Sequence, residues 1–561
     1  LDWLVIGVFF LALIGIIVWV VRQKQNDSAD YFLGGRDATW LAIGASIFAS
    51  NIGSEHLIGL AGAGASSGMA MAHWEIQGWM ILILGWVFVP FYTRSMVYTM
   101  PEFLERRYNP QSRTILSVIS LVSYVLTKVA VTVYAGGLVF QQVFGIKELW
   151  GIDFFWIAAI GLVVLTALYT IFGGMKSVLY TSVLQTPILL LGSLIILVLG
   201  FKELGGWDEM MRLCGAVTVN DYGDTMTNLI RSNDDANFPW LGALIGSAII
   251  GFWYWCTDQF IVQRVLSGKN EMEARRGTIF GAYLKLLPVF LFLIPGMIAF
   301  ALHQKYIGAG GEGFLPMLEN GTANADAAFP TLVAKLLPAG VKGLVVCGIL
   351  AALMSSLASL FNSSAMLFTI DFYKRFRPQT SEKKLVGIGQ VATVVIVILG
   401  ILWIPIMRSV GDVLYTYLQD VQSVLAPGIA AAFLLGICWK RTSAQGGMWG
   451  LISGMVIGLT RLGAKVYYSN AGEVADSTFK YLFYDMNWLF FCGWMFLFCI
   501  IVVIVVSLAT EAPTAEKIQG LVFGTATKEQ KASTRASWNH WDIIHTVIIL
   551  AITGAFYWYF W

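Results

Sequence analysis

Residues 46–56 read Ser-Ile-Phe-Ala-Ser-Asn-Ile-Gly-Ser-Glu-His, a polar stretch interrupted by glycine. The stretch lies inside an apolar segment that is otherwise long enough to cross a bilayer. Lipid cannot satisfy the backbone groups that such an interruption frees, so it is tolerated at membrane depth only where it lines a cavity in the protein. These residues therefore predict a binding site for an ion and a polar solute.

The composition of the chain indicates a membrane protein. Of its 561 residues, 57% are hydrophobic and only 12% are charged, which is not the composition of a soluble protein of this size. A formal net charge of +2 gives no reason to expect a nucleic-acid partner. The six cysteines show no disulfide framework, because five of them fall in or beside apolar spans.

We expect about 14 membrane spans, each near the ~20 residues that cross a bilayer. The spans are 2–22, 39–66, 71–94, 113–143, 152–172, 177–201, 238–262, 276–303, 339–370, 384–408, 412–437, 446–463, 486–509 and 541–561. Most of the 36 lysines and arginines fall in inner loops if the N-terminus is outside. The bias of basic residues predicts that both termini are outside, in a multi-pass protein of the plasma (inner) membrane.

Two spans carry corresponding interruptions. The second span is broken at 49–53, and the seventh carries Gly246 and Gly251 before the run Trp-Tyr-Trp-Cys-Thr-Asp-Gln. Because five spans separate the two marks, the second copy would be inverted, as in inverted-repeat transporters with discontinuous helices. We expect an all-α membrane protein with a single domain over 1–561. Its core repeats would cover about 39–201 and 238–437, with peripheral helices at 2–22, 446–463, 486–509 and 541–561.

Ionisable residues inside the spans need a partner or a cavity. A charge at the bilayer centre costs about 2.5–3.5 kcal/mol on the insertion scale. For His56, Glu75 and Lys285 we expect a role in a binding site. For four other ionisable residues the sequence identifies no partner, and pairing with a neighbouring helix is the simpler interpretation. They are Lys128, Asp258, Asp420 and His73.

Ser355, Ser356 and Ser359 bring three small hydroxyls to about one helical turn. Such residues can serve only for close packing between membrane helices. Sodium is the alternative, because Na⁺ prefers oxygen ligands and the broken stretch offers carbonyls at Ala49 and Ile52. With that stretch in the same chain, we favour a sodium site.

Aromatic residues accompany the polar ones, among them Trp74, Tyr254 and Trp255. Many of the chain's aromatics would simply line the membrane interfaces. Beside a polar cluster, they suit a sugar, whose C–H face stacks on a ring while its hydroxyls need donors and acceptors. The arginines within the predicted spans lie at or near the span ends and not in the span interiors, so a neutral polyol fits better than an anion.

Several stretches resemble the solute:sodium symporter family, and within it the sodium/glucose cotransporters. They are Asn51-Ile52-Gly53-Ser54-Glu55-His56, Trp253–Gln259 with Val262-Gln263-Arg264, Tyr283-Leu284-Lys285-Leu286, Ser355–Ser363 and Asp371-Phe372-Tyr373. The similarity covers about residues 30–445. It implies an inverted-repeat fold of the leucine-transporter type, with five plus five core spans.

The resemblance also implies roles for individual residues. The sugar would contact Asn51, His56, Glu75, Tyr254, Lys285 and Gln419, with Trp255 beside the site. The outer gate would consist of Leu60, Trp74 and Tyr415, and the inner gate of Tyr254. Sodium would be held by the carbonyls of Ala49, Ile52 and Ala352 and by the hydroxyls of Ser355 and Ser356.

The chain departs from the family pattern at five positions. His56 matches animal glucose members, whereas bacterial galactose members often have glutamine there. Gly251 and Gly78 replace polar sugar ligands of a bacterial galactose member. Ser182 replaces an aspartate associated with a second sodium site, and Ala358 lacks a hydroxyl seen in members with two sodium ions, so we expect one sodium site.

We interpret the chain as a sodium-coupled symporter of a glucose- or galactose-type monosaccharide. Another cargo of the same fold, such as myo-inositol or a sugar acid, is the alternative. An enzyme would need a nucleophile–base pair or a metal constellation, and the sequence has no HExxH, no GxSxG and no clustered Cys/His ligands. We expect no cofactor beyond the coupling ion. A channel is the third possibility, but matched breaks around one closed site argue against a continuous pore.

Overall fold

The computed structural model describes residues 1–23, 27–53, 55–318, 321–410, 414–470 and 475–561. Helices dominate this part of the chain, and its one sheet is a hairpin of β1 (Glu148–Leu149) and β2 (Ile152–Asp153). The predicted all-α membrane fold is confirmed.

Ten helices of the described residues are long and apolar enough to cross a membrane. They are Asp2–Val21, Glu55–Ser95, Phe154–Leu204, Trp240–Thr257, Glu271–Gly308, Val341–Phe376, Glu382–Trp403, Val421–Cys438, Trp488–Ala509 and His540–Tyr559. The number 14 stays a prediction, because helices and spans do not correspond one to one. For example, α11 (Phe154–Leu204) contains two predicted spans joined at Gly174, whose φ of 53° interrupts the helix.

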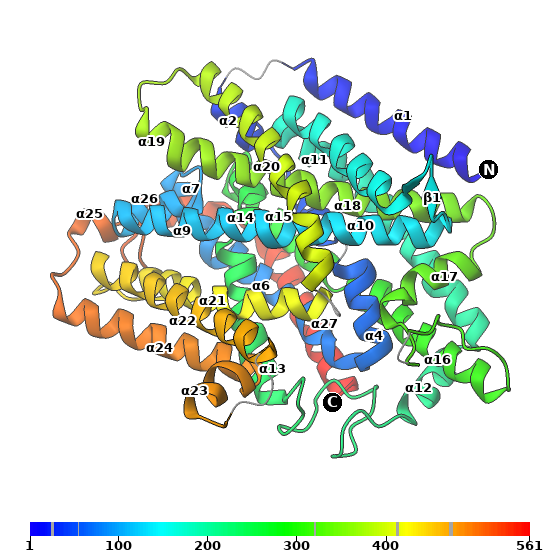
Figure 1. The fold of residues 1–561 in the computed structure, drawn as a ribbon. Coiled ribbons are helices and arrows are strands. Elements are labelled where there is room, and N and C mark those ends of the chain that lie inside the picture. Colours follow the sequence, from blue (N-terminus) through cyan, green and yellow to red (C-terminus); the bar gives the residue numbers. More distant parts are fainter. Residues whose placement is uncertain (24–26, 54, 319–320, 411–413, 471–474) are drawn as a thin grey trace.

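In Figure 1 the N-terminus and β1 lie at one end of the helical bundle. The short helices α19 (Lys374–Phe376), α25 (Ala515–Ile518) and α26 (Lys528–Ala536) lie at the other end. Asp2 accepts hydrogen bonds from the backbone of Gly340 and Gly343, and the carbonyl of Phe560 accepts one from Leu229. If the N-terminus is outside, the predicted spans place the long loops 202–237 and 304–338 outside as well. The C-terminal end contacts the first of these loops at Leu229, and the N-terminal end contacts residues that directly follow the second.

The first predicted break is confirmed. Helix α3 (Trp40–Asn51) ends where Ile52 takes an extended conformation, with φ −79° and ψ 104°. The chain becomes helical again in the wide π-helical turn η2 (Glu55–Leu60) and continues as α4 (Ala61–Ser67). The hydroxyls of Ser50 and Ser359 lie 2.6 Å apart and join the end of α3 to α18 (Val341–Met366).

The second break lies later in the chain than its glycines indicate. Helix α13 (Trp240–Gly251) runs through Gly246 and Gly251 without interruption and continues as the π-helical η6 (Phe252–Thr257). Asp258 is extended, with φ −76° and ψ 128°, and α14 (Gln259–Leu266) starts after it. The aspartate side chain caps α14 by accepting from the amide of Phe260, which explains why the new helix starts there.

Three further elements carry site residues, namely α5 (Ala72–Glu75), α6 (Gly78–Ile83) and α15 (Glu271–Lys285). The predicted peripheral spans correspond to α1 (Asp2–Val21), α22 (Ala444–Asn470), α24 (Trp488–Ala509) and α27 (His540–Tyr559). Other α-helices are α2 (Ser28–Leu33), α7 (Val89–Ser95), α8 (Met100–Arg107), α9 (Pro110–Ser123), α10 (Ala130–Phe144), α12 (Trp207–Gly215), α16 (Ile294–Gly308), α17 (Ala328–Leu336), α19 (Lys374–Phe376), α20 (Glu382–Val410), α21 (Leu414–Cys438), α23 (Thr478–Lys480), α25 (Ala515–Ile518) and α26 (Lys528–Ala536). The 3-10 and π-helical turns are η1 (Gly34–Arg36), η3 (Gly68–Met71), η4 (Leu84–Phe88), η5 (Tyr124–Val129), η7 (Val289–Leu293), η8 (Ala325–Ala327), η9 (Leu367–Tyr373) and η10 (Tyr481–Asp485).

Candidate binding site

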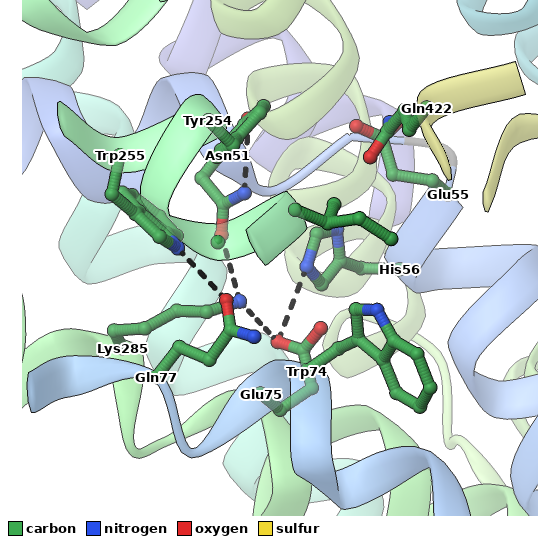
Figure 2. A pocket seen from close by; sticks show the side chains of 12 residues that line it. Asn51, Glu55, His56, Trp74, Glu75, Gln77, Tyr254, Trp255, Lys285 and Gln422 are labelled. Atoms are coloured by element: carbon green, nitrogen blue, oxygen red, sulfur yellow. Dashed lines mark hydrogen bonds and ion pairs between the residues drawn. The ribbon is translucent and has the colours of Figure 1, made fainter. Parts of the chain in front are cut away.

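A polar pocket lies where the two broken helices meet α5, α6 and α15. Its cavity volume is about 60 Å³, well below the roughly 300–1,000 Å³ usual for ligand pockets, so the lining side chains lie close together in this structure. Its lining residues are Asn51, Glu55, His56, Trp74, Glu75, Gln77, Ile250, Gly251, Tyr254, Trp255, Lys285 and Gln422. Figure 2 shows the side chains of Asn51, His56, Glu75, Gln77 and Lys285 gathered around one point.

Glu75 and Lys285 form the charged centre of the pocket. Lys285 Nζ donates to Glu75 Oε2 at 2.5 Å and to Asn51 Oδ1 at 3.2 Å. His56 Nε2 lies 3.3 Å from the same carboxylate oxygen. All four side chains are buried, so each charge depends on its partner rather than on water. The cluster is balanced in charge and rich in donors and acceptors.

Aromatic rings form one wall of the pocket. Tyr254 and Trp255 meet edge to face with centroids 4.9 Å apart, and the Tyr254 hydroxyl accepts from Asn51 Nδ2 at 3.1 Å. The Lys285 ammonium lies 5.4 Å from the centroid of the Trp255 ring. Trp74 stacks on Trp488 of α24, with centroids 5.5 Å apart. The pocket thus combines flat apolar faces with hydrogen-bonding groups.

Most residues predicted to bind the sugar line this pocket. They are Asn51, His56, Glu75, Tyr254, Trp255 and Lys285, joined by the predicted gate residue Trp74. Leu60, also predicted for the outer gate, is fully buried and does not line the pocket. The side chains of Tyr415 and Gln419 lie outside the described residues.

Three polar lining residues had no assigned role in the sequence analysis. Gln422 follows Gln419 by three residues in α21, so helical spacing was a usable signal for it. Glu55 belongs to the broken stretch itself. Gln77 had no signal of its own, because its position in the pocket depends on packing against α13.

The residues predicted to bind sodium are all buried. Ser356 lies against the break, since a methyl group placed on Gly53 would be 3.1 Å from the Ser356 hydroxyl. Ser355 lies 3.3 Å, hydroxyl to hydroxyl, from Ser182 of α11. Ala49 and Ile52 are at the end of α3, and Ala352 is one helical turn before Ser355 and Ser356 on α18. These oxygens suit a hard cation without a carboxylate ligand.

A second buried ion pair lies beside Tyr254. Lys128 Nζ donates to Asp258 Oδ2 at 2.7 Å, and the hydroxyl of Tyr124 donates to the other carboxylate oxygen. The same ammonium lies 4.8 Å from the centroid of the Tyr254 ring. Lys128 and Asp258 are therefore each other's partner, a pairing that the sequence did not identify.

Broken helices around a polar cavity define a secondary transporter. A profile of the sodium:solute symporter family matches residues 31–454. The chain belongs to this family, and sodium is its coupling ion.

Curated relatives match along most of the chain. The human sodium/myo-inositol cotransporter 2 is 37% identical over 538 residues, covering 93% of this chain and 79% of the relative. The dog sodium/myo-inositol cotransporter is 37% identical, with 93% and 75% coverage. The mouse sodium/glucose cotransporter 4 is 36% identical, with 93% and 78% coverage.

Among solved structures, the substrate-bound outward-open state of a Na⁺-coupled sialic acid symporter has the same fold. Its TM-score is 0.72 at 22% identity, with 91% of this chain and 98% of that chain covered. The predicted discontinuous-helix transporter fold is confirmed by this likeness and by the breaks at Ile52 and Asp258.

Proposed function

We propose that this protein couples sodium entry to the uptake of a neutral cyclic polyol, either a glucose- or galactose-type hexose or myo-inositol. The observation that carries the proposal is the buried set of Asn51, His56, Glu75 and Lys285 beside Trp255. Hydroxyls both donate and accept, so they match a site that offers carboxylate, ammonium, imidazole and amide groups together. The indole face would cover the C–H face of the ring.

The charge of the pocket argues against a sugar acid. Among the described residues that line the pocket, Lys285 is the one lysine, and there is no arginine. Its ammonium already pairs with Glu75 at 2.5 Å. Glu55 adds a further acidic group to the lining. An anionic cargo would meet this acidic group without a cation free to pair with its carboxylate, which is costly in a buried site.

Sodium and the polyol would be coupled through the broken stretch. Ile52, a proposed sodium ligand, directly follows Asn51, a proposed polyol ligand. Sodium held between Ile52 and Ser356 would order the break and place the Asn51 amide for the polyol. By linkage, the polyol would in turn tighten sodium binding. One charge moving down 100 mV supplies about 2.3 kcal/mol to this cycle.

We assign the chain a transport role without catalysis, in the plasma (inner) membrane with both termini outside. Two observations support the orientation: the contacts of both chain ends with or near the predicted outer loops, and the gathering of basic residues in the opposite loops. We propose Tyr254 as the inner gate, with Leu60, Trp74 and Tyr415 as the outer gate.

Uptake into proteoliposomes tests the proposal. Purified protein would be given labelled glucose, galactose, mannose, myo-inositol and glucuronate under an inward sodium gradient, with potassium replacing sodium as the control. We expect sodium-dependent uptake of a hexose or of myo-inositol, but not of glucuronate. The relatives named for myo-inositol make it a cargo to test equally with glucose. Uptake of glucuronate alone, or uptake independent of sodium, would contradict the proposal.

A further inference from the structure

Gln77 occupies space in the pocket that Gly251 leaves open. A methyl group built on Gly251 would lie 2.5 Å from Gln77 Oε1 and 2.9 Å from its Cδ, far too close for any real contact. The two residues are therefore alternatives in space: glycine at 251 admits the glutamine, and any larger residue at 251 would displace it. Both line the pocket, beside Glu75 and Trp255.

The Gln77 amide is held from two sides. Its Nε2 donates to the carbonyl of Ser247 in α13 at 2.8 Å, and its Oε1 accepts from Trp255 Nε1 at 3.3 Å. These contacts hold the amide in one orientation, because the carbonyl needs the NH₂ group and the indole N–H needs the oxygen. Figure 2 shows this amide between Trp255 and Glu75, next to the Lys285 ammonium.

Within the part of the chain that the structure describes, half of the hydrogen-bonding capacity of the Gln77 amide is unused. A glutamine side chain has two N–H donors and two acceptor lone pairs. The contacts with Ser247 and Trp255 use one of each. Gln77 is only 3% exposed and lines the pocket. The unused donor and acceptor can therefore form hydrogen bonds with a group in the pocket rather than with bulk water. A buried amide in this state rejects a cargo that lacks the matching hydroxyl.

We propose that Gln77 is a specificity-determining residue of the site, reading one hydroxyl of the polyol from a position that Gly251 makes available. The inference rests on the proposed function, since it concerns the same pocket and the same class of cargo. It adds a recognition group that differs from the Glu75–Lys285 centre, and it assigns Gly251 a steric role in substrate choice.

The first test compares transport of analogues that each lack one hydroxyl. Wild type and Gln77→Met would be assayed by competition with the parent polyol and its mono-deoxy analogues. A lost neutral hydrogen bond weakens binding by roughly three- to tenfold. We expect Gln77→Met to weaken the parent by this factor while leaving one deoxy analogue unaffected, so that discrimination against that analogue disappears. Gln390→Met, a half-buried glutamine that donates to Ile171 outside the pocket, is the control.

A role limited to holding Trp255 would weaken the parent and every analogue by the same factor. That result, or an unchanged ranking, would overturn the inference. Absence of sodium-driven uptake of any polyol by the wild type would instead defeat the proposed function itself, so the two failures are distinguishable.

The second test uses the steric relation and does not depend on Gln77→Met folding. Gly251→Ala pushes the glutamine away, so it should change the ranking of analogues in the same direction. Adding Gln77→Ala makes room for the methyl group, and we expect uptake in Gly251→Ala/Gln77→Ala to exceed that of Gly251→Ala alone. Additive losses in the double variant would show that the two residues do not share the space, and would overturn the inference.

Discussion

At the scale of single residues, Glu75 neutralises Lys285, and under the proposed function its carboxylate would also accept from the cargo. Its Oε2 receives Lys285 Nζ at 2.5 Å and lies 3.3 Å from His56 Nε2. Removing one partner of a buried ion pair costs roughly 3–5 kcal/mol, whereas replacing both by apolar groups costs far less. Stability and binding can therefore be separated by mutation.

We predict that Glu75→Ala lowers the melting temperature and weakens polyol binding by about ten- to a hundredfold, because a hydrogen bond to a charged group is worth about 1.5–3 kcal/mol. Glu75→Ala/Lys285→Met should recover the melting temperature but not the affinity. Thermal unfolding and calorimetry measure the two effects. Sodium binding without polyol should persist in Glu75→Ala. Normal polyol affinity in this variant would mean that the site is misplaced.

Ser356 offers a second prediction at this scale. Its hydroxyl faces the break near Gly53, where lipid cannot replace a lost sodium ligand. Ser356→Ala should reduce sodium-driven uptake at least tenfold at fixed sodium and raise the sodium concentration for half-maximal uptake. The matched control is Ser364→Ala, a buried serine of the same helix away from the break. Equal sodium dependence in both variants would leave Ser356 with a packing role only.

At the scale of elements, the pair Lys128–Asp258 joins η5 to the second break. Asp258 also caps α14, so the pair holds the start of that helix beside Tyr254. If Tyr254 is the inner gate, losing the pair should favour the open inner route, since one of the contacts that close it is gone.

We predict that Lys128→Gln makes Cys256 react with a thiol reagent about tenfold faster than in the wild type. Cys256 is fully buried in η6, two residues after Tyr254, so its alkylation reports opening at this place. Both proteins would carry Cys438→Ser to remove an exposed thiol. Lys480→Gln, which breaks an exposed pair with Asp476 far along the chain, serves as the control. An unchanged alkylation rate of Cys256 would show that this ion pair does not control opening of the inner gate.

At the scale of the whole molecule, the number of sodium ions per cycle sets how steeply the cargo is concentrated. Ser182 donates its hydroxyl to the carbonyl of Val178 at 2.6 Å and brings no charge to the neighbourhood of Ser355. Ala358 has no hydroxyl to add. We therefore expect one sodium per polyol.

With one sodium per polyol, a tenfold sodium gradient without a membrane potential concentrates the polyol about tenfold; with two, about a hundredfold, since each factor of ten is about 1.4 kcal/mol. Accumulation at steady state in proteoliposomes clamped at zero potential measures this ratio. Ser182→Asp is the informative variant. It places a carboxylate next to Ser355, at the position where the family resemblance associates an aspartate with a second sodium site. A wild-type ratio near a hundredfold would contradict the single-site prediction.

The sequence by itself determined the membrane class, the break at the end of α3 and most of the residues that line the pocket. The physical reason is local: an interrupted polar run in an apolar span has unsatisfied backbone groups that lipid cannot meet, wherever the other helices lie. The second break was less accessible to this reasoning, because glycine is tolerated within α13, and the helix stops only at Asp258.

Only the tertiary structure decided which distant side chains meet. Lys128 and Asp258 are 130 residues apart and become partners because η5 packs beside the second break. Gln77 enters the pocket because Gly251, on a different helix, leaves room for its amide. Such pairings depend on how helices approach one another, and the energy of a buried charge or amide is defined only by the neighbours that this approach supplies.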